Sequence, residues 1–536
     1  MAGTRDSPER VNVAMDDFGT SRHDEKKDFD AAEIERVMTP DDLRKGKQDY
    51  SRIDAEVAKY TEGERIGITD SENRRLKKMI DKRVLTVMVF TYFLQAIDKG
   101  TLSFTSIMNL PADLHLKGQQ YSWLTTCIYI AILVVEYPLN WLVQRLPVAK
   151  FLGTCIILWG SILALHAASR NFAEIASLRT LLGIFEAGCQ PTFLIMSSMW
   201  YKREEQVLIV SFWYCMNGAQ QIVGGLLAYC FSLIPRGSAL ESWQAIFIAY
   251  GTFSVLWGVF VIAYLPDSPM RAKCFSEPDK RLMVERVRSN QTGLQNKRFR
   301  IEQVKEAFTD VQCWCYWLIQ ICTTLPTGGL GAFANIVIKG FGFTTLQVQL
   351  LAMVLGAYII LVLFSSAWLV RKTRQNVLVM MVYTIPSFAG TIVLMTVRNT
   401  NTATEAGLLL SYYLCLSFWA AQNLAMSLLT RNVAGQTKKS AAVAMNFVAW
   451  AAGNAVGPQV FLNHDAPRYF TAFATHLGCY SLLIVVLLTL RTTLRRRNSI
   501  RNAADARRHG DDDDDGMVHA FEDLTDRENV GFRYMF

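Results

Sequence analysis

Histidine and charged residues are scarce in this sequence. The 536 residues include 7 histidines, and His166, His464 and His476 lie in or near separate apolar segments. A metal site needs several ligands at close spacing, so this scatter gives no support to a metal centre. Charged residues make up 19% of the chain, whereas soluble domains contain about 25%. The composition disfavours a soluble enzyme, and we expect no enzymatic activity, cofactor or metal.

Cysteine is present, but not in the pattern of a disulfide-stabilised domain. The chain contains 11 cysteines, of which Cys313 and Cys315 form an isolated C-x-C and most others lie within apolar segments. Neither a disulfide framework nor a zinc site follows from this spacing, and packing roles are expected. An apolar run of signal-peptide type is also missing after Met1, which predicts that no leader is cleaved.

The charged residues that are present gather at the two ends and in a central stretch, 271–310. Elsewhere, apolar segments of membrane-spanning length recur, and they lack the period-two alternation of transmembrane strands. We therefore predict an all-α membrane protein with twelve transmembrane helices in two six-helix halves. The predicted spans are 84–108, 121–142, 150–169, 174–200, 206–233, 243–265, 313–337, 346–370, 376–397, 405–428, 440–463 and 469–490.

The charge of the loops predicts the orientation, because Lys and Arg accumulate on the cytosolic side of membrane proteins. The loops after even-numbered spans are richer in Lys and Arg than the opposite loops, so both termini are predicted to be cytosolic. The similar stretches WLVQR at 141–145 and WLVRK at 368–372 occupy equivalent positions in the two halves, as expected of a repeat. The predicted parts are a largely disordered cytosolic tail at 1–82, the N-terminal half at 83–270, a cytosolic central loop at 271–311, the C-terminal half at 312–492 and a cytosolic tail at 493–536.

Four charged side chains fall inside the predicted spans. Asp98 and Lys99 lie in the first span, and Arg179 and Glu186 lie seven residues apart on one face of the fourth. A charge deep in a membrane helix costs about 2.5 to 3.5 kcal/mol on insertion scales, so it usually faces a partner or a watery cavity. The helical rise places the four groups at depths from which they could share one cavity.

The charges of these four groups sum to zero. A bound carboxylate would add an unpaired negative charge at low dielectric unless an acidic side chain took up a proton. We therefore predict that an anion and a proton move together, with Asp98 and Glu186 as proton-coupling residues and Lys99 and Arg179 as substrate-binding residues. The alternative is structural: Asp98 and Lys99 at the outer interface with Lys99 snorkelling, Arg179 as a partner of the outer loops, and Glu186 in a purely structural role.

Several motifs carry a resemblance to a known family. They are IDKGTLSF at 97–104, DLHLKGQQYSW at 113–123, EYPLNWLVQRLPVAK at 136–150, LPDSP at 265–269, GGLGAFANIVIKGFGF at 328–343, and NVAGQTKKS with GNAVGPQVF within 432–461. Together they resemble the anion:cation symporter family of the major facilitator superfamily, especially its fungal branch of allantoate and nicotinate permeases. The motifs span essentially the whole predicted membrane domain.

The resemblance implies roles for individual residues. In this family an acidic-basic pair on the first helix, usually Asp-Arg, couples proton and substrate. Asp98 matches it, whereas Lys99 replaces the Arg and lacks the planar fork that binds a carboxylate with two hydrogen bonds. The resemblance further implies that Arg179 is the substrate-side cation, Glu186 the main proton site and Asn454 a substrate-contacting amide.

Other candidates have two interpretations each. Asn335 and Asn217 are predicted either to bind a ligand or to hydrogen-bond a neighbouring helix. Arg145 and Lys150 match the cytosolic loop with which the superfamily holds its inner gate shut. Glu136 is expected to pair with Arg145 as a gate or packing element rather than to touch substrate.

These features predict a secondary active transporter that takes up a small organic anion with protons by alternating access. A nicotinate-like or allantoate-like carboxylate, a plasma-membrane location, a monomer within the lipid bilayer and no nucleic-acid partner are expected. Two alternatives stay open, an exporter of a secondary metabolite and a nutrient-sensing receptor with the same fold. The stretch GAQQIVGGLLA at 218–228 lacks the proline of an antiporter signature, which disfavours export without excluding it.

Overall fold

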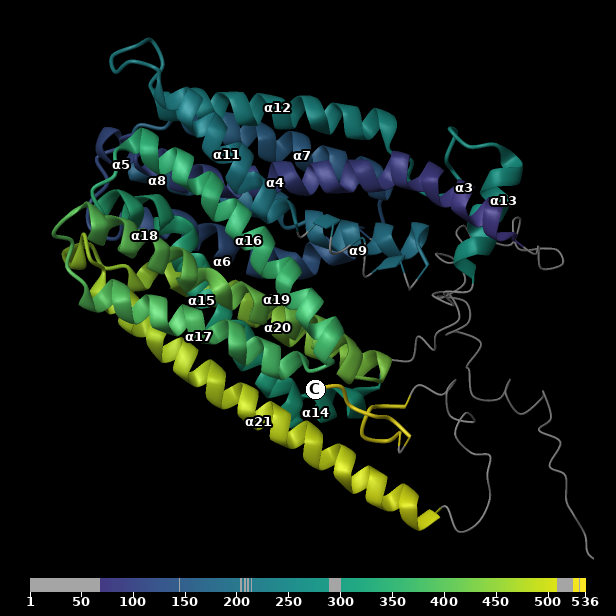
Figure 1. Ribbon diagram of the computed structural model, residues 1–536. Helices are drawn as coiled ribbons and strands as arrows, with labels where there is room; N and C mark the ends of the chain where they lie inside the picture. Colours follow the sequence, from purple (N-terminus) through teal and green to yellow (C-terminus); the bar gives the residue numbers. More distant parts are fainter. Residues whose placement is uncertain are drawn as a thin grey trace, which may run out of the picture. The chain divides into compact units, whose positions relative to one another are not determined.

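The computed structural model describes residues 68–143, 145–202, 205, 206, 209, 212, 213, 215–288, 300–508, 524–529 and 531–536. All of them belong to one compact unit, residues 64–536. Figure 1 shows packed helices, and the described residues contain no β-strand. Most of the predicted N-terminal tail, residues 1–67, and residues 509–523 of the predicted C-terminal tail lie outside the described residues.

Helix α3, Asp70–Ile80, lies in the segment for which the sequence predicts a largely disordered tail. A capping box closes its first turn, because Thr69 and Glu72 each hydrogen-bond the backbone N–H of the other. Leu76 and Ile80 are buried, so the helix packs through an apolar face. Residues 70–80 are therefore an ordered part of this tail.

Apart from the short helix α5, the helices of the N-terminal half overlap the predicted spans. The fourth predicted span is divided into two helices, because Pro191 lacks the N–H that would bond the Ala187 carbonyl. In chain order the elements are η2 Asp81–Leu85, α4 Thr86–Ser106, α5 Leu110–Asp113, α6 Gln120–Val143, α7 Val148–Leu165, η3 His166–Ala168, α8 Phe172–Glu186, α9 Cys189–Trp200, α11 Met216–Ser232 and α12 Ser242–Tyr264.

The C-terminal half follows two short helices of the predicted central loop, α13 Glu277–Arg288 and α14 Ile301–Thr309. Its last helix continues well beyond the predicted span, to Arg508. The elements are α15 Val311–Gly340, α16 Thr345–Thr373, α17 Asn376–Thr396, α18 Thr402–Cys415, η4 Leu416–Phe418, α19 Trp419–Asn432, α20 Gln436–Val456, η5 Gly457–Val460, η6 Asn463–Asp465 and α21 Phe470–Arg508.

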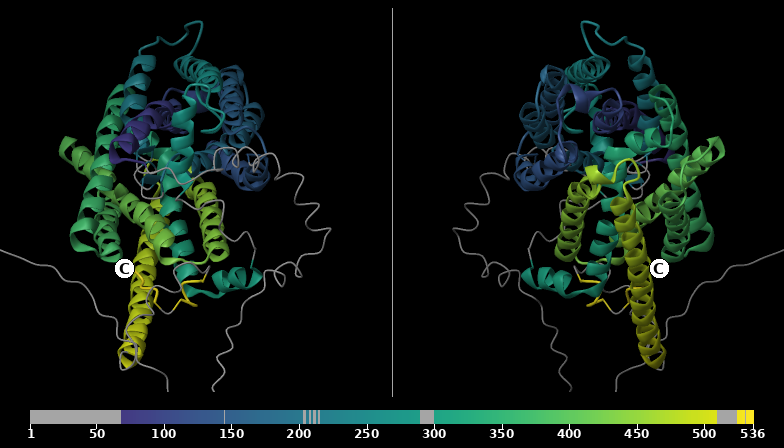
Figure 2. Two further views of the ribbon diagram at one scale, coloured as in Figure 1. Left: turned by 90° about the vertical axis from the view of Figure 1, so that its right-hand side faces the viewer. Right: turned by 90° about the vertical axis from the view of Figure 1, so that its left-hand side faces the viewer.

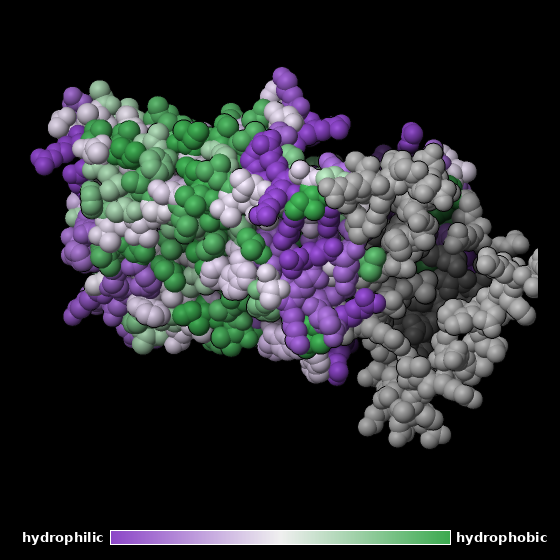
Figure 3. All heavy atoms as spheres, turned by 90° about the horizontal axis from the view of Figure 1, so that it is seen from below, coloured by the Kyte–Doolittle hydropathy of each residue, from purple (hydrophilic) through white to green (hydrophobic). Residues whose placement is uncertain are grey.

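Among the described residues, seven helical segments are long and apolar enough to cross a membrane; they comprise α6, α7 with η3, α12, α15, α16, α17 and most of α21. Figure 3 shows a broad zone of hydrophobic side chains between hydrophilic ends on the face that it presents. Exposed apolar side chains such as Leu256, Phe364 and Ile385 contribute to the helix surfaces, where lipid would cover them. The membrane character is confirmed, whereas the count of twelve spans and the cytosolic termini stay predictions.

The two halves are joined along α11 and α16 and along α6 and α20. A Cβ atom on Gly356 would lie 2.6 Å from the Gly218 carbonyl oxygen, so only glycine permits this approach of α11 to α16. Tyr121 Oη donates to the Ala332 carbonyl at 2.9 Å, and Thr126 Oγ1 donates to the Ala455 carbonyl at 2.7 Å. Both bonds lie near the start of α6, and their acceptors are on α15 and near the end of α20, which is the outer side in the predicted topology.

The other end of α6 is not enclosed. No residue from 133 to 142 is buried, whereas Tyr121, Leu124, Ile128 and Ile132 in the first half of the same helix are buried. A membrane helix that faced lipid on one side alone would keep a buried stripe along its whole length. The structure is therefore closed at the predicted outer side and open at the predicted cytosolic side.

Candidate functional site

Asp98 is fully inside the N-terminal half, where it lies between α4, α7 and α12. Trp159 Nε1 donates to Asp98 Oδ2 at 2.9 Å, and Ser254 Oγ donates to the same oxygen at 3.4 Å. The other oxygen, Oδ1, is buried without a hydrogen-bond partner among the described residues. An indole N–H can only donate, so this arrangement provides Asp98 with donors rather than with a cation.

Lys99 and Glu186 form the ion pair that joins α4 to α8. Lys99 Nζ lies 3.1 Å from Glu186 Oε1, and their side chains are 29% and 3% exposed. The acid is therefore enclosed by protein, while the lysine side chain as a whole stays partly accessible. The structure brings these two predicted residues together, and among the four predicted charges this is the pair within ion-pair distance.

Arg179 is buried against aromatic side chains. Its guanidinium carbon lies 5.7 Å from the centroid of the Phe247 ring, and His166 stacks on the same ring at 5.2 Å. Its Nε and Nη2 atoms have no hydrogen-bond partner among the described residues. The four predicted charges thus lie in one half of the protein, but not as a single bonded cluster.

The three predicted asparagines have different environments. Asn454 Nδ2 donates to the Trp450 carbonyl in its own helix at 2.8 Å. Asn217 Nδ2 donates to Tyr92 Oη at 3.1 Å, which links α11 to α4. Asn335 is buried on α15. In this conformation Asn217 therefore hydrogen-bonds a neighbouring helix, which is one of the two roles predicted for it.

The predicted contact between Glu136 and Arg145 is not formed in this conformation. Glu136 Oε1 accepts a hydrogen bond from Asn140 Nδ2 at 3.4 Å, and the described residues show no ion pair between Glu136 and Arg145. The Arg145 guanidinium instead lies 4.0 Å from the centroid of the Trp141 ring. Arg145 follows the end of α6, so the nearest partner for its cation is the aromatic face one turn earlier.

Lys150 contributes its backbone to a helix cap. Asp267 Oδ1 accepts from the backbone N–H of Ala149 at 3.1 Å and from that of Lys150 at 3.4 Å. A carboxylate at a helix N-terminus satisfies free N–H groups and is favoured by the helix dipole. The Asp of the LPDSP motif therefore ties the start of α7 to the end of α12, and the Lys150 side chain stays exposed.

Sequence reasoning missed several aromatic residues that connect the site. Trp159 holds Asp98, and Tyr129 meets Trp450 of the other half with ring centroids 5.4 Å apart in an edge-to-face arrangement. A signal was present, because tryptophan and tyrosine inside an apolar span need a partner for their polar atoms. Their partners, however, lie on other helices and are not readable from spacing.

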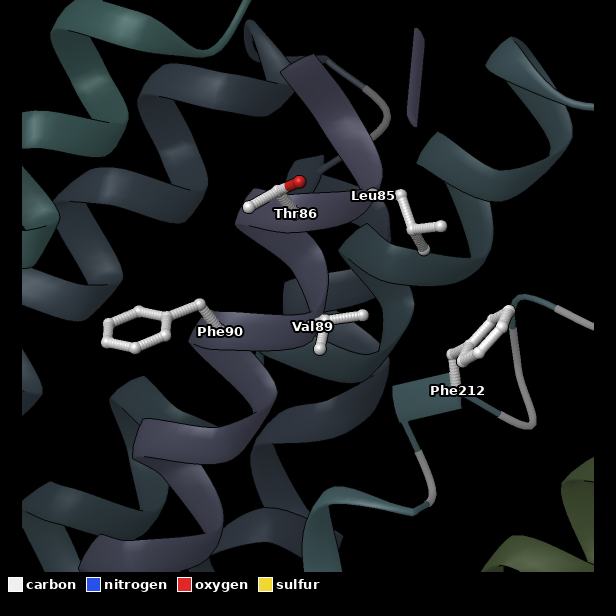
Figure 4. A pocket seen from close by; sticks show the side chains of 5 residues that line it. All are labelled: Leu85, Thr86, Val89, Phe90 and Phe212. Carbon is white, nitrogen blue, oxygen red and sulfur yellow. The ribbon is translucent and has the colours of Figure 1, made fainter. Parts of the chain in front are cut away.

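Two other features do not belong to this site. A shallow pocket has the mostly apolar lining expected of a lipid contact, and Figure 4 shows the side chains that line it. Its lining residues are Leu85, Thr86, Val89, Phe90 and Phe212.

A second cluster comprises Glu306, Asp310 and Asp526, each with an oxygen within 4.8 Å of the others. Lys438 Nζ contacts all three at 2.6 to 2.9 Å. The ammonium group of Lys438 therefore already occupies the position between these acids.

The sequence matches the profile of the Major Facilitator Superfamily over residues 88–458. It is 30% identical to the allantoate permease of Saccharomyces cerevisiae, an alignment that covers 99% of each chain. It is also 31% identical to the thiamine pathway transporter THI73 of the same yeast over 86% of each chain.

Solved structures of low identity share the fold. The D-xylose-proton symporter superposes with a TM-score of 0.57 at 14% identity, covering 76% of this chain and 96% of that one. A bacterial homolog of the human lysosomal transporter Spinster, in an inward-facing and occupied conformation, superposes with a TM-score of 0.58 at 13% identity. That superposition covers 77% of this chain and 96% of the other.

Proposed function

The chain belongs to the Major Facilitator Superfamily, and from this premise we propose that it takes up a small organic anion together with protons by alternating access. It is a multi-pass membrane transporter and not an enzyme. The similarity to an allantoate permease supports a carboxylate of that size as substrate. The observation that carries the proposal is the ion pair between the partly accessible Lys99 and the enclosed Glu186.

The ion pair supports a mechanism of exchange. A substrate carboxylate that binds Lys99 replaces Glu186 as the partner of the ammonium group. Glu186 would then be an unpaired buried charge, which is strongly disfavoured, so it takes up a proton. Anion and proton therefore enter together, and the charge within the site is the same before and after binding.

Release reverses these steps. When Glu186 loses its proton to the cytosol, its carboxylate competes with the substrate for Lys99. The re-formed ion pair leaves the substrate without its cation and favours dissociation. The opening of the structure at the predicted cytosolic side is compatible with this releasing conformation.

Asp98 and Arg179 have supporting roles in this proposal. Asp98 is a second proton site, held by Trp159 and Ser254 and separated from the ion pair. The buried guanidinium of Arg179 offers donors without a partner among the described residues, which suits a carboxylate that enters from the predicted outer side. A plasma-membrane location, twelve spans, cytosolic termini and a monomeric state complete the proposal.

The experiment is uptake of a panel of labelled carboxylates into proteoliposomes, with and without an inward proton gradient. We expect accumulation above equilibrium when the gradient is present. The Glu186→Gln variant should lose accumulation but retain exchange of substrate for substrate, because its side chain no longer titrates. The matched control is Glu174→Gln, which neutralises an exposed acid on the same helix. Equal accumulation by wild type and Glu186→Gln would refute the proposal.

A further inference from the structure

The chain enters the membrane domain along one continuous helical path. Helix α3 runs through the π-turn η2 into α4, and Figure 1 shows these elements in line. Between Asn73 and Ile97 this path carries six cations but a single acid, Asp81. All six cations lie just before the first predicted span, which begins at residue 84. Such an excess of positive charge beside a membrane span attracts anionic groups at the membrane surface.

Three of the six cations are held by the protein itself. Arg75 forms an ion pair with Asp279 of α13, and Lys77 Nζ lies 3.4 Å from Glu205 Oε1. The guanidinium carbon of Arg83 lies 3.6 Å from the centroid of a tyrosine ring at the end of α12. These contacts fix how α3 is turned about its own axis, and therefore which of its side chains face outward.

The other three cations form a row on the outward face. They are Arg74, Lys78 and Lys82, and all three are exposed. Residues four apart are neighbours on a helix surface, so the row follows one side of the helical path. Among the described residues, none of the three side chains has a hydrogen bond, an ion pair or a ring contact. Their charges are therefore available to a partner outside the chain.

The row leads directly to the apolar pocket of Figure 4. Lys82 precedes Leu85 by three residues and Thr86 by four, so it shares a face with both of these lining residues. Figure 4 shows Phe212, from another segment, facing Leu85 and Val89. The pocket has a volume of about 300 Å³, which is at the lower end for ligand pockets. It suits part of an acyl chain rather than a whole lipid.

One wall of the pocket is anchored in the fold. The ring of Phe90 lies 4.4 Å from that of Trp257 and 6.1 Å from that of Phe253, measured between centroids. Trp257 Nε1 in turn donates to Thr91 Oγ1 at 2.9 Å, which ties α12 to α4. The wall is therefore in place before any ligand arrives.

The depth of the cations selects two of them as headgroup ligands. At 1.5 Å per residue, Lys82 lies about 3 Å and Lys78 about 9 Å outside the start of the predicted span, whereas Arg74 lies about 15 Å outside it. The headgroup layer on each side of a bilayer is about 5 to 8 Å thick. Long lysine side chains can move their ammonium groups by several ångströms toward this layer. Lys78 and Lys82 can therefore reach one phosphate, and Arg74 stands too far out.

We propose that Lys78, Lys82 and the adjoining pocket form a binding site for one anionic phospholipid of the cytosolic leaflet. The phosphate lies between the two ammonium groups, and one acyl chain occupies the pocket. An anionic lipid fits better than a free phosphate ion, because the cations adjoin an apolar surface that an inorganic anion would leave empty. The inference depends on the membrane location of the chain but not on the transported substrate or on protons.

Native mass spectrometry of the full-length, delipidated protein in detergent tests the headgroup contacts. The protein is titrated with dioleoyl phosphatidylglycerol and, separately, with dioleoyl phosphatidylcholine. Each juxtamembrane cation strengthens binding to an anionic lipid about fivefold, so Lys78→Gln/Lys82→Gln should bind phosphatidylglycerol about 25-fold more weakly. Its binding of phosphatidylcholine should change little. The matched control, Lys305→Gln/Lys339→Gln, removes the same charge from exposed positions outside the site and should behave like wild type. Equal affinity of wild type and the Lys78/Lys82 variant for phosphatidylglycerol would overturn the site.

The pocket is tested by filling it without a change of charge. Val89→Trp should weaken phosphatidylglycerol binding by at least about tenfold, which corresponds to the lost burial of two CH₂ groups. If Val89→Trp melts well below wild type, Thr86→Trp fills the same pocket from an exposed position. Unchanged affinity in the folded tryptophan variant would overturn the acyl-chain contact. Inorganic phosphate should not displace the bound lipid, and displacement would instead identify a simple anion site.

Discussion

Replacing Lys438 with methionine tests what holds together the cluster of Glu306, Asp310 and Asp526. The substitution keeps the length of the side chain but removes the ammonium group that three carboxylates share. Glu306, Asp310 and Asp526 then lie within 4.8 Å of one another, with Arg497 as the remaining cation at Asp310. Breaking a buried ion pair by removal of one partner costs about 3 to 5 kcal/mol. We expect a loss of stability of this size.

The assay is thermal unfolding of the purified full-length protein in detergent, followed by intrinsic fluorescence. For a unit the size of the C-terminal half, a loss of this size lowers the melting temperature by an amount on the order of 10 °C. The control is Lys305→Met, which removes an exposed cation from α14. The double variant with Asp526→Asn should recover part of the loss, because one of the unpaired carboxylates is gone. A Lys438→Met protein that melts within a degree of wild type would refute the reasoning.

Three further predictions follow from named contacts. Millimolar Ca²⁺ should raise the melting temperature of the methionine variant but not of wild type, because the freed carboxylates are suitable oxygen ligands. Trp159→Phe should lower the free energy of unfolding, measured by denaturation with a chaotrope, by about 1.5 to 3 kcal/mol, since it removes a donor to the buried Asp98. Trp123→Phe, at a position that is 44% exposed, should change this free energy little. Gly356→Val should separate α11 from α16 and therefore reduce chemical cross-linking between the two halves. Gly407→Ala, whose added Cβ atom meets open space, should leave the cross-linking unchanged.

The positions of most helices could be predicted from composition alone. A run of about 20 apolar residues bounded by charge has few structures available to it in a membrane, because every backbone N–H and C=O must bond within the segment. The observed α6, α12 and α17 agree with their predicted spans within two residues. The break between α8 and α9 was harder to predict from the sequence, since it depends on one proline inside an apolar run.

The burial of the charged residues could be predicted from the sequence, but the identity of the two that form an ion pair could not. Burial of Asp98, Arg179 and Glu186 follows from the high cost of a charge facing lipid, and the structure buries all three. The sequence offered no reason to join Lys99 to Glu186 rather than to its neighbour Asp98. Adjacent residues on a helix point in directions about 100° apart, so the two side chains are presented to different helices.

The amino-acid sequence by itself determined that the chain is a helical membrane transporter and which charges lie inside it. These properties depend on local periodicity and on the transfer of side chains between water and lipid. Only the tertiary structure decided that Trp159 holds Asp98, that Arg145 stacks on Trp141, and that the end of the chain supplies Asp526 to Lys438. Such contacts join residues far apart in sequence or select among neighbours, and helix packing in three dimensions sets their distances.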